Sequence, residues 1–164
     1  MNFNDLTSIK SNGFSGFVKI SDLIQNDSVI PKEKGTYMVL SIDGSMPAFV
    51  SKGSGGFFKG KDPNASIDKL KNNWVEGTRV LYIGKAGGPS SQATLNSRLK
   101  QYLRFGQSKN VGHWGGRYIW QIKDSQNLMI CWNPTIEDPR EVEMLLIQNF
   151  LKEYFKLPFA NLTT

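Results

Sequence analysis

The stretch VLYIGKAGG (residues 80–88) has the composition of a buried strand and ends in a group of glycine and lysine residues. Its first four positions hold branched and aromatic side chains, which favour strands. A glycine-rich ending with a lysine is also found in phosphate-binding loops of nucleotide-binding proteins. Such a loop requires glycine where Arg79 stands and serine or threonine where Ala86 stands, so the sequence excludes it.

Strand and helix signals alternate on both sides of this stretch. Residues 37–42 form a compact apolar run that predicts an earlier core strand. On the other side, apolar residues recur at helical spacing over residues 95–103, and we expect that helix to end at Gly106. Aromatic and branched residues in two later runs, 112–124 and 127–133, predict a β-hairpin.

The order of these elements defines an α+β fold, in which helices flank a small central antiparallel sheet. A chain of 164 residues, of which 39% are hydrophobic, is long enough for one buried core. We therefore expect a single domain over residues 1–164. Residues 1–34 form its N-terminal arm, with a short amphipathic helix over residues 16–25.

Residues 43–78 separate the two predicted core strands. The first part of this segment is rich in glycine, serine and lysine, which predicts a loop. Its second part has apolar residues at helical spacing over residues 67–74, with Asn64 or Ser66 as the helix cap.

The charge balance favours polyanionic partners, because twenty Lys and Arg against fourteen Asp and Glu give a net charge of +6. With one cysteine, Cys131, and one histidine, His113, the chain lacks an internal disulfide and a His/Cys set for zinc. No apolar run is long enough to cross a bilayer, and the first residues lack the pattern of a signal peptide. We therefore expect no membrane contact and a cytoplasmic protein, with association with the nucleoid left open.

The clearest helix pattern starts at a capping box formed by Asp138 and Glu141 and ends before Pro158. Within it, Glu143 lies on the same face as apolar residues that follow at offsets of three, four and seven. A buried carboxylate requires a cation, a metal or several hydrogen-bond donors. A structural ion pair and a functional site are equally consistent with this position of Glu143.

Arg98 lies at the edge of the apolar face of the helix over residues 95–103, one turn before Tyr102. Its guanidinium group could bind a phosphate with two hydrogen bonds. An ordinary exposed arginine fits the same spacing.

Five segments together resemble the signature blocks of the GIY-YIG nuclease superfamily, in the same order. They are GTY (35–37), YIGK (82–85), LNSRLKQY (95–102), EVEMLLIQNFLKEY (141–154) and PFAN (158–161). The ββαβα core of that family also agrees with the predicted order of elements. The resemblance implies a metal-dependent endonuclease that hydrolyses phosphodiester bonds in DNA.

The resemblance also implies roles for single residues. Tyr37 and Tyr82 match the tyrosines placed around the attacking water, and Lys85 matches a lysine that assists deprotonation. Arg98 matches the arginine that binds the scissile phosphate. Tyr102 matches a position that is tyrosine or histidine in family members. Glu143 matches the carboxylate that binds one divalent metal ion, and Asn161 matches the asparagine that organises the site. A single carboxylate ligand suits Mg²⁺ or Mn²⁺, since Mg²⁺ keeps most of its waters.

The segment 43–78 is much longer than its equivalent in compact members of this superfamily and is interpreted as an insertion. Its lysines alternate with phenylalanines, as in surfaces that bind nucleic-acid strands, although a solvated loop is equally consistent. The predicted nucleic-acid-binding residues are Lys52, Lys59, Lys61, Arg98, Lys100 and Arg104. Specificity would come from this insertion, from a homodimer or from a partner protein, and the sequence favours none of the three.

Two alternatives to a nuclease stay open. The chain could be a nucleic-acid-binding module of the same fold without turnover, or another small basic α+β protein in which Glu143 lies far from Arg98 and the two tyrosines. His113 is the alternative catalyst, because histidine is the usual base near neutral pH. Its aromatic and glycine-rich surroundings favour a packed turn instead.

Overall fold

The computed structural model describes residues 1–163 and contains one antiparallel sheet of four strands in the order β1-β4-β2-β3. The strands are β1 (Ser15–Lys19), β2 (Gly35–Leu40), β3 (Val80–Ala86) and β4 (Met129–Pro134). The core order β2, β3, α4, β4, α5 is the predicted ββαβα succession, in which α4 and α5 are the helices Leu95–Phe105 and Pro139–Tyr154. The predicted α+β class with a small antiparallel sheet flanked by helices is confirmed.

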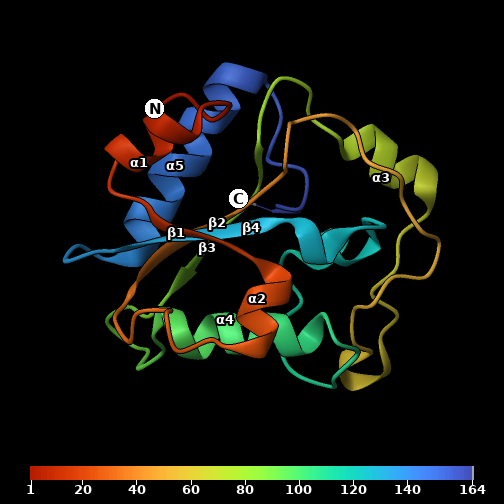
Figure 1. The fold of residues 1–164 in the computed structure, drawn as a ribbon, viewed down its shortest axis with the longest axis horizontal. Helices are drawn as coiled ribbons and strands as arrows, with labels where there is room; N and C mark the ends of the chain where they lie inside the picture. Colours follow the sequence, from red (N-terminus) through yellow and green to blue (C-terminus); the bar gives the residue numbers. More distant parts are fainter. Residues whose placement is uncertain (164) are drawn as a thin grey trace.

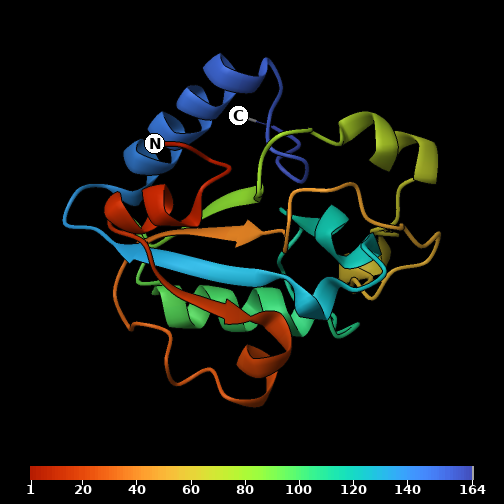
Figure 2. The same ribbon diagram turned by 45° about the horizontal axis from the view of Figure 1, so that its top comes forward.

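Helices cover both faces of the sheet. The shorter helices are α1 (Leu6–Ser11), α2 (Ile20–Gln25) and α3 (Ile67–Asn73), and short 3₁₀ turns cover Phe58–Gly60, Arg117–Gln121 and Ser125–Asn127. Figure 1 shows α1 and α5 on one face of the sheet and α2 and α4 on the other, and Figure 2 shows the same layers after a rotation. Within residues 1–163, no helix combines the length and the apolar character that crossing a bilayer requires.

The central strand β2 is buried over its whole length. Tyr37 and Val39 belong to the core that the sheet shares with α4, whereas Met38 and Leu40 belong to the core that it shares with α5. A strand that is covered on both faces has a continuous apolar run instead of alternating polar and apolar residues. This accounts for the apolar run at residues 37–40, whereas Ile42, the last residue of the predicted strand, lies beyond β2 and is exposed.

The predicted helix over residues 16–25 is wrong in its first half. Residues Ser15–Lys19 form the edge strand β1 beside β4, and the helix α2 begins only at Ile20. Gly16 has a φ of +93° and packs against the ring of Trp132, where a Cβ atom would lie 2.6 Å from the ring. The N-terminal arm therefore completes the sheet. The helical spacing of apolar residues over residues 16–25 extends into strand β1 by coincidence.

The predicted β-hairpin is wrong in its first strand. Residues Met129–Pro134 form β4 as expected, but Arg117–Gln121 form a 3₁₀ turn. Gly116 precedes this turn with a φ of +73°, and the consecutive side chains of Tyr118, Ile119 and Trp120 are all buried. The aromatic residues reflect burial in the core and not the alternation of a strand.

Helix ends agree more closely with the sequence. Ser66 caps α3, and α4 ends immediately before Gly106. Asp138 caps α5 by accepting a hydrogen bond of 3.0 Å from the backbone N–H of Arg140. Asp138 is the predicted N-cap, but the predicted capping box with Glu141 is wrong, since the side chain of Asp138 accepts from Arg140 and not from Glu141.

The segment 43–78 lies beside the sheet and is attached to the core by the buried side chain of Gln121. Its amide nitrogen donates hydrogen bonds to the carbonyl oxygens of Val50 and Ala65, at 3.1 and 2.8 Å. Its amide oxygen accepts a hydrogen bond of 2.7 Å from the backbone N–H of Ala65. These bonds hold α3 and the loop before it against the remainder of the molecule, at the right of Figure 1.

Candidate active site

A cleft of about 230 Å³ lies at the junction of β2, β3, α4 and α5. Five of the predicted site residues line it, each supplied by one of these elements: Tyr37, Tyr82, Lys85, Arg98 and Glu143. Glu143 therefore lines the same cleft as Arg98 and the two tyrosines, and the separation that would have established a coincidental motif match is not observed.

Gly84 makes the position of Tyr37 possible. The two residues are cross-strand partners in β2 and β3, and the Tyr37 ring lies directly over the glycine. A Cβ atom at residue 84 would lie 2.5 Å from Cζ and 2.6 Å from the hydroxyl oxygen of Tyr37. The glycine within the strand therefore serves the close approach of a side chain, which is a usual reason for glycine inside a strand.

The hydroxyl group of Tyr37 lies 3.2 Å from Nε2 of His113, and both residues are buried. Nδ1 of His113 lies 3.0 Å from the carbonyl oxygen of Gly115. Because a carbonyl group only accepts, Nδ1 carries the hydrogen and Nε2 accepts a hydrogen bond from Tyr37. Burial, with a further contribution from Arg98, lowers the pKa of His113 to about 3, so the imidazole is neutral.

His113 is thus both packed, as the sequence indicates, and joined to a predicted site residue. The signal that singles it out in the sequence is its being the one histidine of the chain, placed beside glycines in an aromatic segment. The periodicity of the sequence does not predict the contact between His113 and Tyr37, because this contact depends on the loop after α4.

Tyr102 lies behind the cleft and does not line it. Its hydroxyl group donates a hydrogen bond of 3.0 Å to the carbonyl oxygen of Gly116, and its ring stacks on His113 with centroids 4.5 Å apart. Its ring also packs against the rings of Tyr82 and Tyr37, with centroids 5.8 and 6.4 Å apart. The structure therefore gives Tyr102 a supporting position.

Tyr82 links the cleft to a neighbouring hollow of about 600 Å³, which it lines together with Glu143 and Asn161. Burial, and then the charge of Glu143, raise the pKa of Tyr82 to about 12. Burial also raises the pKa of Tyr37 well above that of a free phenol. Both phenols are therefore protonated at neutral pH.

Glu143 extends from α5 between the cleft and this hollow, and its side chain is half-buried. Burial raises the pKa of Glu143, while Lys85, Arg98 and Arg140 oppose that shift. Among residues 1–163 the one ion pair within 4 Å joins Lys100 and Asp27, so the Glu143 carboxylate has no such partner. An unpaired, partly desolvated carboxylate at the wall of a polar cleft is suited to act as a ligand of a divalent cation.

Arg98 is half-buried at the opposite side of the cleft. Its Nη1 donates a hydrogen bond of 3.3 Å to the side-chain oxygen of Gln101. The guanidinium group keeps other N–H donors for a ligand, since it has five in total. Lys85, from the end of β3, adds a second cation to the cleft.

Asn161 holds the C-terminal segment on the edge of the sheet. Its amide oxygen accepts from the backbone N–H of Ile83, and its amide nitrogen donates to the Ile83 carbonyl oxygen, both at 2.9 Å. The backbone N–H of Ala160 donates a further hydrogen bond of 2.8 Å to Leu81. The side chain is therefore a structural anchor beside Tyr82.

The other predicted nucleic-acid-binding residues line neither the cleft nor the hollow of 600 Å³: Lys52, Lys59, Lys61, Lys100 and Arg104. Lys59 lies over the ring of Phe58, and Lys100 forms the ion pair with Asp27.

Comparisons with protein-family models, with curated proteins and with solved structures found no match to the chain.

Proposed function

We propose that the protein is a divalent-metal-dependent endonuclease of the GIY-YIG type, which hydrolyses phosphodiester bonds in DNA. The observation that carries this proposal is the convergence of two phenols, two cations and one unpaired carboxylate, from four separate elements, on one cleft. Cations at one wall and a carboxylate at another suit an anionic substrate that requires charge compensation on both sides.

Arg98 supplies the phosphate-binding group. Its planar guanidinium matches two phosphate oxygens and stabilises the additional negative charge that develops during attack. Lys85 adds positive charge at the same cleft. Loss of one such preorganised group lowers turnover by about 10²–10³-fold in enzymes of comparable design.

Glu143 would hold one Mg²⁺ or Mn²⁺ ion through its unpaired carboxylate. Within residues 1–163 no three acidic, histidine or cysteine side chains cluster as a metal site, so water and substrate oxygens would supply the other ligands. When bound, the ion neutralises charge on the phosphate and the leaving oxygen. The half-buried position of Glu143 keeps its carboxylate directed at the substrate and partly shielded from water.

Tyr37 orients the attacking water. Because its hydroxyl hydrogen is donated to Nε2 of His113, the oxygen of Tyr37 acts only as an acceptor toward the cleft, where it would receive a hydrogen bond from a water. His113 therefore acts as a positioning residue for Tyr37. Its lowered pKa argues against its taking the proton of the water in the ground state.

The test is conversion of supercoiled plasmid to nicked and linear forms by the purified protein, with Mg²⁺, with Mn²⁺ and with EDTA. We expect cleavage that requires the metal and is lost in Glu143→Ala and Arg98→Ala. Tight, salt-sensitive DNA binding without cleavage would instead assign the protein to the class of non-catalytic binding modules.

A further inference from the structure

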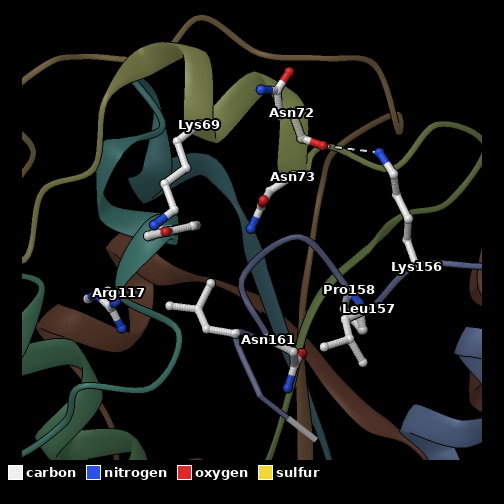
Figure 3. A pocket seen from close by; sticks show the side chains of 10 residues that line it. Lys69, Asn72, Asn73, Arg117, Lys156, Leu157, Pro158 and Asn161 are labelled. Carbon is white, nitrogen blue, oxygen red and sulfur yellow. Dashed lines mark hydrogen bonds between the residues drawn. The ribbon is translucent and has the colours of Figure 1, made fainter.

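A second hollow, of about 430 Å³, lies where α3, the 3₁₀ turn Arg117–Gln121 and the C-terminal segment meet. Figure 3 shows Lys69 and Asn73 extending into it from α3, with Arg117 and Asn161 on the facing side. Three cationic residues and no acidic residue line it. This hollow is therefore a concave, positively charged surface away from the predicted lysine-rich loop.

The hollow adjoins the hollow of about 600 Å³, with which it shares Arg117, Asn161 and Leu162. That hollow in turn shares Tyr82 and Glu143 with the cleft. The cleft, the hollow of about 600 Å³ and the cationic hollow are therefore neighbours in this order.

Arg117 is held in place by aromatic rings and not by carboxylates. Its guanidinium carbon lies 4.5 Å from the ring centre of Trp114 and 5.4 Å from that of Tyr118. Its one hydrogen bond within residues 1–163 is long, at 3.5 Å, to the carbonyl oxygen of Trp114. Stacking uses the face of the guanidinium group and leaves its edge with N–H donors for an anion.

The two lysines of the hollow differ in their availability. Lys156 donates to the carbonyl oxygens of Asn72 and Trp74, at 3.0 and 3.3 Å, and the first of these bonds is drawn in Figure 3. Lys69 is exposed on α3 and, within the described chain, forms no ion pair within 4 Å. Lys69 and Arg117 are therefore the cations available to a ligand.

We propose that this hollow binds a backbone phosphate of the DNA strand whose scissile phosphate lies at Arg98. The inference rests on the proposed function, since it takes the cleft as the place of hydrolysis. A strand carries one phosphate per nucleotide, so a strand that runs from the cleft across these neighbouring hollows would present further phosphates to Lys69 and Arg117. Such contacts fix the position of the strand without reading its sequence.

The test is equilibrium binding of a labelled DNA duplex, in EDTA to prevent cleavage, over a series of salt concentrations. We expect Lys69→Ala and Arg117→Ala each to weaken binding about tenfold and to reduce the slope of log K against log salt by about one. The matched control is Lys71→Ala, because Lys71 is exposed on the same helix and lines neither hollow. Lys69 is exposed, so its replacement tests the site even where Arg117→Ala fails to fold.

Binding of both variants equal to that of Lys71→Ala would overturn the inference. The inference would also be overturned if the two variants lost binding of inorganic phosphate but bound DNA like the wild type. That result would indicate a site for a small anion. Plasmid cleavage by the wild-type protein, measured in parallel, separates the two proposals. If the wild-type protein cleaves the plasmid and both variants bind DNA like the control, the phosphate site alone is contradicted. If both variants bind DNA more weakly but the wild-type protein does not cleave, the hydrolytic function alone is contradicted.

Discussion

The hydroxyl group of Tyr37 and Nε2 of His113 form a buried hydrogen bond of 3.2 Å, in which the phenol donates to a neutral imidazole. The imidazole is fixed by its own hydrogen bond to Gly115 and by stacking on Tyr102. Tyr37, which lines the cleft, is therefore supported from behind by His113 and Tyr102, each of which orients the next group. This arrangement makes the direction of the Tyr37 lone pairs a property of the fold.

The pair should behave as one unit in catalysis. We expect His113→Ala to lower kcat for DNA cleavage roughly 100-fold with little change in KM, since a misdirected phenol loses its hold on the water. Tyr37→Phe should have a similar effect, and the double variant should be no slower than the slower single variant. Losses that multiply in the double variant would show that His113 acts independently of Tyr37.

The same histidine should make stability depend on pH. Its pKa is lowered by burial to about 3 in the folded protein, whereas an unfolded chain has the ordinary value of about 6.5. Between these values the unfolded chain binds more protons, so the free energy of unfolding falls as the pH falls. We expect it to be about 2 kcal/mol lower at pH 5 than at pH 7 on this account alone.

Urea unfolding of the wild type and of His113→Gln, at both pH values, measures this contribution. The comparison cancels other titrating groups, including Glu143, whose raised pKa acts in the opposite direction. An equal dependence on pH in the two proteins would contradict a buried neutral His113.

Glu143 should oppose folding at neutral pH in the absence of metal. Because burial raises its pKa, its contribution to stability is present at low pH and is lost as the pH rises through the pKa of the folded state. We expect Glu143→Gln to raise the free energy of unfolding at pH 7, by at most about 1 kcal/mol because part of the group stays hydrated.

Thermal unfolding with and without Mn²⁺ completes this test. A metal that binds the folded state raises Tm, and it should do so in the wild type and in Glu141→Gln but not in Glu143→Gln. Glu141 is an exposed carboxylate on the same helix and serves as the matched control. An equal shift in all three proteins would place the metal elsewhere.

Gly84 should tolerate no side chain while Tyr37 keeps its position. A methyl group at residue 84 would lie 2.5 Å from the Tyr37 ring, so Gly84→Ala must displace that ring or separate the strands. We expect a loss of about 1–3 kcal/mol in stability and a fall in cleavage. Wild-type cleavage and an unchanged Tm in this variant would show that the placement of the ring is incorrect.

The sequence was sufficient to predict the elements whose local signals agree with their tertiary environment. Strand β2 has a continuous apolar run because both of its faces are buried, and α5 has a cap and an apolar face and ends at Tyr154, before Pro158. Glu143 was singled out because a carboxylate interrupts an apolar face, which is a local feature, whereas its role as a metal ligand was implied by the resemblance alone.

The parts that the sequence did not predict depend on contacts between distant segments. Strand β1 exists because Gly16 packs on Trp132, and no period within residues 16–25 reports that contact. His113 and Arg117 lie in a segment without regular spacing. The partner of His113 comes from β2, and the hollow that Arg117 lines is completed by α3 and the C-terminal segment. The aromatic residues of that segment are buried in the core, and a composition rich in aromatic residues is also typical of a strand.

The most direct test of the central claim compares two carboxylates of α5 in one plasmid-cleavage experiment with Mg²⁺. The account predicts that Glu141→Gln cleaves like the wild type, while Glu143→Gln loses at least about 100-fold in rate and still binds DNA. Cleavage by Glu143→Gln at the wild-type rate would contradict the assignment of the cleft as the site of hydrolysis.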